Sequence, residues 1–158
     1  MPAAIRPLLA SDLDRVVAIE RQAFSDPWPR SAFIELLEQP HVRGLAIEAD
    51  LPSPDHRLAG YALGLVAADE AEILNLAVAP DARRSGLGRA LLDGLLATFR
   101  RERVATVHLE VRQSNAGAVR LYQAAGFRAV STRRAYYRNP TENALTMTLR
   151  LNSESALK

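Results

Sequence analysis

The hydrophobic positions of this chain repeat with two different spacings, and each spacing predicts one kind of secondary structure. From Gly86 to about Arg101, leucines and a phenylalanine recur every three or four residues, which places them on one face of an α-helix. From Val104 to Val111, valine and leucine alternate with polar residues, which is the period-two pattern of a β-strand. Together the two patterns indicate a protein that contains both helices and strands.

The same criteria, with proline and glycine as breaks, divide the chain into elements in the order βααβββαβαββ. The predicted strands are Ala4–Leu9, Val42–Ala49, Leu58–Ala68, Ala71–Val78, Val104–Val111, Arg128–Arg134 and Ala144–Leu151. The predicted helices are Asp12–Phe24 with Ser11 as its N-cap, Arg30–Leu37, Gly86–Arg101 and Asn115–Ala125. Residues 50–57 form the predicted tip of a hairpin. This order predicts an α/β (α+β) fold, in which a mixed central sheet carries helices on both faces.

The length of 158 residues predicts one domain, over residues 1–151, followed by a polar tail at residues 152–158. Hydrophobic residues make up 48% of the chain and charged residues 24%, which is typical of a globular protein and argues against disorder or a coiled coil. The absence of cysteine excludes disulfides, a thiolate nucleophile and a cysteine zinc site. The three histidines lack metal-ligand spacing, so the sequence predicts chemistry without a metal.

The formal net charge is only +2, so overall charge does not favour binding to nucleic acid. The segment Arg133–Arg138 combines arginines with two tyrosines and could contact nucleic acid, but we favour a peptide-binding loop. The N-terminus has no continuous apolar run of the kind that precedes a signal cleavage site. We therefore expect a cytoplasmic protein without a membrane or a direct nucleic-acid partner. The sequence leaves the oligomeric state open and is compatible with a monomer.

A basic, glycine-containing loop, Arg83–Arg89, lies between a predicted strand and a predicted helix. Backbone N–H groups and the dipole at a helix start favour an anion, and Gly86 and Gly88 allow its close approach. The alternative is a glycine turn that leads into a helix with a solvated basic face. The loop is neither a Walker loop nor a complete dinucleotide fingerprint. It therefore predicts a diphosphate-bearing ligand other than ATP in a P-loop or NAD.

A resemblance to a known family rests on this loop and its surroundings. The run Ile73–Val78, then Pro80 and the R-x-x-G-x-G loop resemble the acetyl-CoA binding motif of GCN5-related N-acetyltransferases. Further segments are similar to the bacterial ribosomal-protein N-terminal alanine acetyltransferases in this family: Leu109–Arg112, Ser114–Asn115, Leu121–Tyr122 and Gly126–Phe127. The spacing agrees closely over about residues 71–138 and more loosely elsewhere. The resemblance implies a mostly antiparallel sheet and acetyl-CoA as cosubstrate.

The resemblance also assigns contacts to acetyl-CoA by position. The backbone of one strand would pair with the pantetheine arm, through Leu76, Ala77 and Val78. The loop amides would hold the pyrophosphate, over Arg83, Arg84, Ser85, Gly86, Leu87, Gly88 and Arg89. Asn115 would supply a further contact. An unpaired strand edge and a helix start offer the backbone groups that such contacts need.

Acetyl transfer to an amine needs a base, because an α-amine of pKa about 8 is largely protonated at neutral pH. The resemblance places the proton acceptor on Glu110 and the proton donor on Tyr122, beside the departing thiolate. From the residues alone, Glu110 could also be a solvated glutamate and Tyr122 a core residue. If helices covered both sheet faces, Glu110 would be a lone buried carboxylate with a raised pKa. A backbone N–H of Leu76–Val78 is the expected donor to the tetrahedral intermediate.

The resemblance implies acetyl transfer to the N-terminal α-amine of a protein, namely an N-terminal alanine of a small-subunit ribosomal protein. Tyr136 and Tyr137 match the segment that ends the acceptor groove in this subfamily, whereas the residues between Arg138 and Glu142 do not. Small amines, lysines and other protein N-termini therefore stay open as acceptors. A non-catalytic acyl-CoA sensor is the alternative from a different functional class, and retention of both Glu110 and Tyr122 argues against it.

Overall fold

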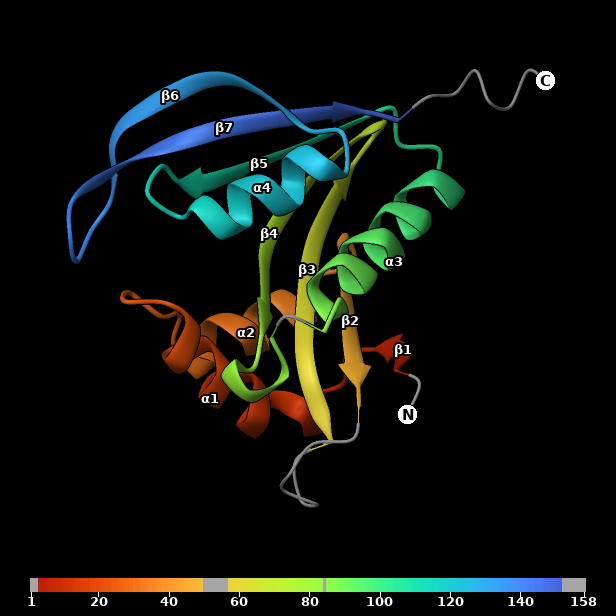
Figure 1. The fold of residues 1–158 in the computed structure, drawn as a ribbon. Helices are drawn as coiled ribbons and strands as arrows, with labels where there is room; N and C mark the ends of the chain where they lie inside the picture. Colours follow the sequence, from red (N-terminus) through yellow and green to blue (C-terminus); the bar gives the residue numbers. More distant parts are fainter. Residues whose placement is uncertain (1–2, 50–56, 84, 152–158) are drawn as a thin grey trace.

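A computed structural model describes residues 3–49, 57–83 and 85–151 of the chain (Figure 1). Its seven strands form one sheet in the order β1-β2-β3-β4-β5-β7-β6. The strands are β1 Ala4–Pro7, β2 Val42–Glu48, β3 Leu58–Ala67, β4 Glu70–Val78, β5 Thr106–Arg112, β6 Arg128–Tyr137 and β7 Glu142–Arg150. The helices are α1 Leu13–Ala23, α2 Arg30–Leu37, α3 Leu87–Arg101 and α4 Ala116–Ala124, with 3-10 turns η1 Ala10–Asp12 and η2 Pro80–Ala82. Every strand pair is antiparallel except β4 with β5.

The mixed, mostly antiparallel sheet carries helices on both faces, as predicted. On one face, a Cβ added to Gly64 of β3 would lie 2.5 Å from the ring of Phe99, so α3 packs directly on the strand backbone. On the other face, Tyr61 of β3 contacts Glu20 of α1 and the ring of Phe33 of α2. The glycine therefore permits the close helix–sheet contact, because any side chain at position 64 would collide with the ring.

The predicted order of strands and helices is confirmed, with most ends shifted by one to three residues. The predicted hairpin is present, since β2 and β3 pair antiparallel, although residues 50–56 of its tip lie outside the described residues. The tail at residues 152–158 lies outside them too. None of the helices in the described segments is long and apolar enough to cross a membrane.

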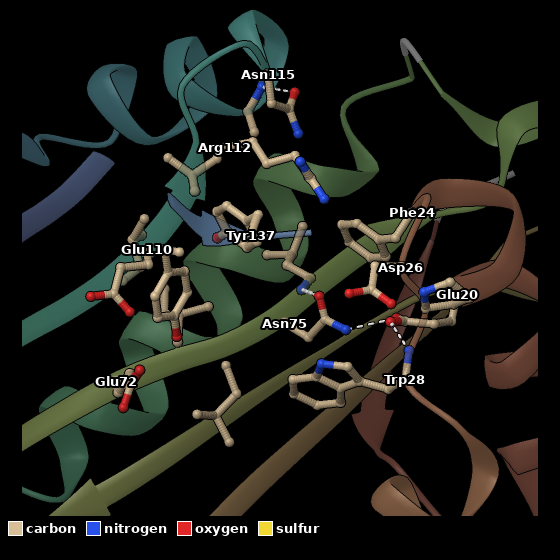
Figure 2. A pocket seen from close by; sticks show the side chains of 18 of the residues that line it. Glu20, Phe24, Asp26, Trp28, Glu72, Asn75, Glu110, Arg112, Asn115 and Tyr137 are labelled. Atoms are coloured by element: carbon tan, nitrogen blue, oxygen red, sulfur yellow. Dashed lines mark hydrogen bonds between the residues drawn. The ribbon is translucent and has the colours of Figure 1, made fainter. Parts of the chain in front are cut away.

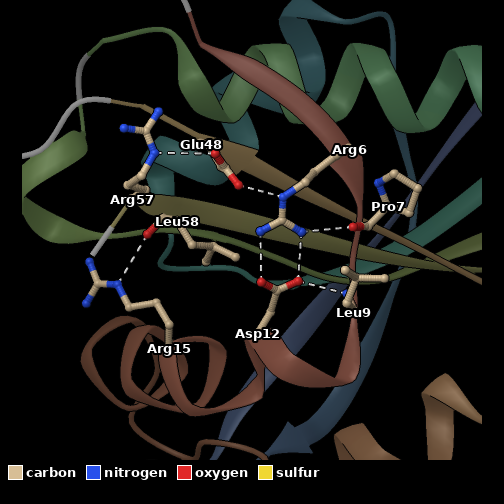
Figure 3. A network of polar contacts seen from close by, with 8 residues as sticks. All are labelled: Arg6, Pro7, Leu9, Asp12, Arg15, Glu48, Arg57 and Leu58. Carbon is tan, nitrogen blue, oxygen red and sulfur yellow. Dashed lines mark hydrogen bonds and ion pairs between the residues drawn. The ribbon is translucent and has the colours of Figure 1, made fainter. Parts of the chain in front are cut away.

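The predicted N-cap at Ser11 is wrong, because the N-cap of α1 is Asp12, whose side chain bonds to residues before the helix and not to its first turn (Figure 3). The carboxylate of Asp12 accepts the backbone N–H of Leu9 at 2.8 Å, which closes the turn η1 before α1. Both of its oxygens also accept from Arg6 of the edge strand β1, each at 2.8 Å. Arg6 donates in addition to Glu48 of β2 at 2.7 Å. The Asp12 carboxylate therefore accepts three hydrogen bonds and ties β1 to the turn that precedes α1.

The feature that positions the site is the separation of β4 from β5. These strands pair in parallel only where Glu70–Ile73 lies beside Thr106–Leu109. Beyond that point β4 follows β3 as far as Val78, while β5 follows β7 as far as Arg112. Figure 1 shows the two strands meeting at one end and spreading apart toward the other. Within the described segments, the edge of β4 that faces β5 therefore has no partner strand from Leu74 onward.

Candidate active site

A cavity of about 650 Å³ opens where β4 and β5 separate (Figure 2). One wall is the connection between α1 and α2, including Phe24 and Trp28, and the opposite wall comes from β5 and α4. Tyr136 and Tyr137 of β6 complete the lining. Glu110, Asn115 and Tyr122 all line this single cavity, although the sequence places them on a strand, at a helix cap and within a helix. The fold thus brings the predicted catalytic residues together with two predicted cofactor contacts, Leu76 and Asn115.

The predicted cofactor strand lies on the open edge of β4. Val78, Ala77 and Leu76 pair with Gly60, Tyr61 and Ala62 of β3 on one side. No strand of the described chain pairs with them on the other side. One of their donors is used locally, since the N–H of Leu76 donates to Oδ1 of Asn75 at 3.2 Å. The remaining backbone groups on the open edge can pair with an extended ligand.

The basic loop leads into α3 as predicted. Gly86 is the N-cap of α3 and has φ of +80°, a left-handed conformation that favours glycine. No atom lies within 4 Å of a Cβ built on Gly86, and Gly88 would make only an ordinary contact, at 3.7 Å from Val78. The first turn of α3 is therefore open to a ligand, and its backbone N–H groups are the anion-binding groups that the sequence predicts.

The loop side chains are partly engaged with the protein itself. The guanidinium of Arg83 donates to the carbonyl of Val78 at 3.1 Å, and Arg89 pairs with Asp93 at 2.9 Å. The hydroxyl of Ser85 donates to the carbonyl of Ala82. Arg84 lies outside the described residues. The arginines therefore hold the loop in shape as well as adding positive charge.

Asn115 has a structural role that the sequence left unassigned. Its Oδ1 accepts the N–H of Ala118 at 3.1 Å and so caps α4. The same side chain lines the cavity. Asn115 therefore fixes the start of α4 at the rim of the site.

Glu110 is not the lone carboxylate that helices on both faces would have produced. Its side chain is 15% exposed, and its Oε2 accepts from Arg133 of β6 at 2.9 Å. Thr146 of β7 donates to the same oxygen at 3.4 Å. The groups that meet this carboxylate come from the β6–β7 hairpin, because α1 and α2 lie over β2–β4 and not over β5. The expectation of an isolated carboxylate is thus corrected to a carboxylate paired with an arginine.

Tyr122 is buried in α4, where its ring packs edge-on against Phe127 with centroids 5.6 Å apart. Burial, and to a lesser degree the neighbouring Tyr137, raises the pKa of its phenol. Among the described residues its hydroxyl forms no hydrogen bond, although the residue lines the cavity. Buried hydroxyls normally have a partner, so this one points to a group supplied by a ligand. The ring therefore packs as a core residue, while the hydroxyl remains available to a bound ligand.

Sequence reasoning missed three carboxylates that line the cavity, Glu20, Asp26 and Glu72. Glu20 is only 1% exposed and accepts from the N–H of Trp28 at 2.9 Å, from Nδ2 of Asn75 at 2.7 Å and from the hydroxyl of Tyr61. Burial raises the pKa of Glu20, and burial together with the charge of Glu110 raises that of Glu72. A signal for Glu20 was present, because it follows the apolar Val16 by four residues on the buried face of α1.

Comparisons with known proteins agree with this arrangement. The profile of the acetyltransferase (GNAT) family matches residues 13–127. The chain belongs to this family. It is 37% identical over 149 residues to the [ribosomal protein bS18]-alanine N-acetyltransferase of Escherichia coli K12, covering 92% of this chain and 95% of that protein. It is 38% identical over 152 residues to the N-alpha-acetyltransferase RimI of Mycobacterium tuberculosis, covering 92% and 91%.

A solved structure supports the same assignment. The crystal structure of the ribosomal-protein-S18-alanine N-acetyltransferase from Escherichia coli superposes with a TM-score of 0.83 at 35% identity, over 94% of each chain. The mostly antiparallel sheet implied by the sequence resemblance is therefore the fold of this acetyltransferase family, and the chain is an N-acetyltransferase.

Proposed function

We propose that this acetyltransferase transfers the acetyl group of acetyl-CoA to the N-terminal α-amine of a protein, with an N-terminal alanine of a small-subunit ribosomal protein as the acceptor. The observation that carries the proposal is that Glu110 and the unpartnered hydroxyl of Tyr122 line one cavity at the separation of β4 and β5. The activities of the bacterial relatives, which align over nearly their whole length, support the choice of acceptor.

Several features fit acetyl-CoA as the cosubstrate. The free edge of β4 at Leu76–Val78 suits the extended pantetheine arm, and the open first turn of α3 suits the pyrophosphate. A side chain at Gly86 or Gly88 would project into this open space. Arg83–Arg89 and Asn115 are therefore the proposed contacts of the cosubstrate, with Leu76, Ala77 and Val78 on the strand.

Glu110 is the proposed base of the reaction. The acceptor ammonium loses a proton to the Glu110 carboxylate, directly or through water, and the neutral amine attacks the thioester carbonyl. The carbonyl oxygen becomes negatively charged in the tetrahedral intermediate, and a backbone N–H of the Leu76–Val78 strand is the proposed donor. Attack of the amine forms the carbon–nitrogen bond. Collapse of the intermediate then breaks the carbon–sulfur bond, the nitrogen gives its remaining extra proton to water or to the departing thiolate sulfur, and coenzyme A leaves.

Tyr122 is the proposed donor to that thiolate. Its raised pKa keeps the phenol protonated at neutral pH, so a hydrogen is always available. A thiol has a pKa of about 8.5, below that of the phenol, so a strong hydrogen bond stabilises the thiolate without requiring full proton transfer. The buried position of the hydroxyl strengthens this bond, because little water competes for it.

An assay with matched acceptors tests the proposed function. We expect acetylation of a peptide that begins with a free alanine, and mass spectrometry should locate the acetyl group on the α-amine. The same peptide with a blocked N-terminus and an internal lysine, and a small polyamine, should both be poor acceptors. Faster reaction of the lysine peptide or the polyamine would replace the proposed acceptor. Binding of acetyl-CoA without transfer to any of the three would support the sensor.

The remaining expectations follow from the acceptor. A ribosomal protein as acceptor places the enzyme in the cytoplasm, and residues 1–151 are proposed as its single catalytic domain. Tyr136 and Tyr137 line the cavity rather than an open basic surface, which supports a peptide-binding role for their segment over direct contact with nucleic acid.

A further inference from the structure

The connection between β6 and β7 is held in place mainly by one side chain, Arg112 at the end of β5. Its Nη1 donates to the carbonyl of Pro140 at 2.8 Å and to Glu142 at 3.1 Å, and its Nη2 donates to the carbonyl of Arg138. Its guanidinium also lies 4.7 Å from the ring centroid of Tyr137. Figure 2 shows Arg112 between Asn115 and Tyr137, at the rim of the cavity. One guanidinium therefore fixes a segment of five residues.

Arg112 can hold this segment because the regular pairing of β6 with β7 is interrupted nearby. The register between β6 and β7 shifts between Arg133 and Tyr137, and pairing resumes at Tyr137 with Glu142. The carbonyls of Arg138 and Pro140 lie outside the ladder, so they are free to accept hydrogen bonds from the Arg112 guanidinium. The planar fork of an arginine can serve several acceptors at once, which a lysine ammonium cannot reproduce in the same geometry.

Glu142 links Arg112 to the residues just before α4. Its Oε1 receives the hydrogen bond from Arg112, while its Oε2 accepts the backbone N–H of Ser114 at 2.7 Å. Ser114 directly precedes Asn115, the cap of α4 and a proposed contact of acetyl-CoA. Hydrogen bonds from Ser114 and Arg112 hold the pKa of Glu142 below its usual range, so the pair is ionised at neutral pH. A continuous set of contacts thus joins the Arg138–Glu142 segment to the start of α4.

We propose that Arg112 and Glu142 are positioning residues that couple the acceptor side of the site to the acetyl-CoA side. The inference rests on the proposed function, because it takes Tyr137, which lines the cavity and directly precedes the Arg138–Glu142 segment, as part of the acceptor side. Acetyl-CoA bound at the start of α4 restricts the motion of Ser114. Through its hydrogen bond to Glu142, Ser114 in turn restricts the motion of Arg112 and of the segment that Arg112 holds. The coupling is reciprocal, so a bound acceptor tightens acetyl-CoA binding by the same factor.

Steady-state kinetics of Arg112→Lys and Glu142→Gln supply the first test. Both substitutions should raise the KM for the acceptor peptide, by about tenfold for the loss of one charge-assisted contact. The turnover number at saturating acceptor should change much less, since neither residue touches the reacting atoms. The double variant should be hardly worse than either single variant, because the two residues act as one unit.

The ion pair Arg43–Glu102 is a matched control. Its guanidinium binds the carboxylate at 2.6 and 2.8 Å and donates to the carbonyl of Pro40 at 2.7 Å. The exposures of the two side chains are 30% and 32%, against 18% and 19% for Arg112 and Glu142, and neither control residue lines the cavity. Arg43→Lys and Glu102→Gln should leave the acceptor KM unchanged. An equal rise in these controls would overturn the proposal.

Limited trypsin digestion supplies a test that needs no acceptor. Acetyl-CoA should slow cleavage after Arg138 in the unaltered enzyme by several-fold, and this protection should vanish in Arg112→Lys and Glu142→Gln but persist in the Arg43 and Glu102 variants. Identical protection in all variants would refute the coupling. If protection behaves as expected while no peptide N-terminus is acetylated, the coupling stands and the proposed acceptor fails.

Discussion

Tyr122 shows how one residue can serve both core and chemistry. Its ring fills the space beside Phe127, while its hydroxyl has no protein partner among the described residues. Tyr122→Phe should therefore leave the free energy of unfolding nearly unchanged, because no protein hydrogen bond is lost. The chemical step should slow by about 10²-fold or more if the hydroxyl stabilises the thiolate. Single-turnover rates measure the effect on chemistry, and urea denaturation measures the effect on stability. An unchanged rate would mean that Tyr122 has only a structural role.

Glu110 is the second residue whose role can be separated from the fold. Glu110→Gln should lower turnover by roughly 10²- to 10⁴-fold, because the amide cannot accept the acceptor's proton. Coenzyme A affinity should hardly change, since the base acts on the amine and not on the pyrophosphate. Steady-state kinetics and calorimetric titration with coenzyme A give the two quantities. Turnover close to that of the unaltered enzyme would remove Glu110 from the mechanism.

The sequence could not predict which residue pairs with the Glu110 carboxylate. The residue itself could be identified by its position in a family motif, but its partner Arg133 lies 23 residues away on another strand. Which arginine reaches this carboxylate depends on the shift in register between β6 and β7. No local pattern encodes that shift, so the sequence could not predict that this carboxylate is paired with an arginine.

Among the elements, the start of α3 allows the two loop glycines to be distinguished. Gly86 has a positive φ, so Gly86→Ala should cost about 1–2 kcal/mol of folding free energy as well as weaken binding. Gly88 lies within α3 and has room for a Cβ in the protein alone, so Gly88→Val should leave the fold largely stable. Any loss of affinity in Gly88→Val then reports on the ligand, because the added side chain obstructs its approach to the helix start.

Calorimetry with two ligands tests this assignment. Gly88→Val should bind coenzyme A on the order of tenfold to a hundredfold more weakly, which corresponds to one lost charge-assisted amide contact. Binding of dephosphorylated pantetheine, which has no pyrophosphate, should be almost unaffected. Equal losses for both ligands would mean that the loop shapes the fold rather than holding phosphates.

The elements differ in how well the sequence predicts them, and burial explains the difference. α3 and β5 each have one fully buried face, which leaves a clear period in the sequence. In β6, by contrast, every residue from Arg128 to Tyr136 is exposed, so no alternation marks its end. The strand therefore continues to Tyr137, three residues beyond the predicted end at Arg134, and its hydrogen bonds with β7 hold it there. Backbone pairing, which sequence patterns do not record, decides such edges.

For the whole molecule, Glu20 joins the parts that form the cavity. Its carboxylate receives hydrogen bonds from the α1–α2 connection, from β3 and from β4, through partners 8, 41 and 55 residues along the chain. Asn75 in turn contacts the backbone of Leu76 on the proposed cofactor strand. These three hydrogen bonds form only once the sheet and α1 have packed together. The helical spacing of apolar residues in α1 could therefore indicate that Glu20 is buried, but not which groups bond to it.

The buried carboxyl of Glu20 predicts a specific dependence of stability on pH. Because burial raises its pKa in the folded state, the folded protein holds this proton at pH values where the unfolded chain, with a glutamate pKa of about 4.3, has released it. Glu20 therefore lowers the free energy of unfolding as the pH rises above about 4, until the folded carboxyl also ionises. Glu20→Gln removes this titration but leaves one donor, the N–H of Trp28 or Nδ2 of Asn75, facing the new amide nitrogen. That cost does not depend on pH, so it does not alter the pH dependence of the difference.

The measurement is the difference in unfolding free energy between the unaltered enzyme and Glu20→Gln, from urea denaturation at pH values between about 4 and 7.5. The difference isolates one residue, because Asp12, Glu48 and Glu102, whose pKa values are lowered by arginines, titrate equally in both proteins. We expect the unaltered enzyme to lose stability relative to the variant as the pH rises, and the difference then to level off. A difference independent of pH would mean that the three donors offset the burial of Glu20 completely, so that its carboxyl titrates alike in the folded and unfolded chains.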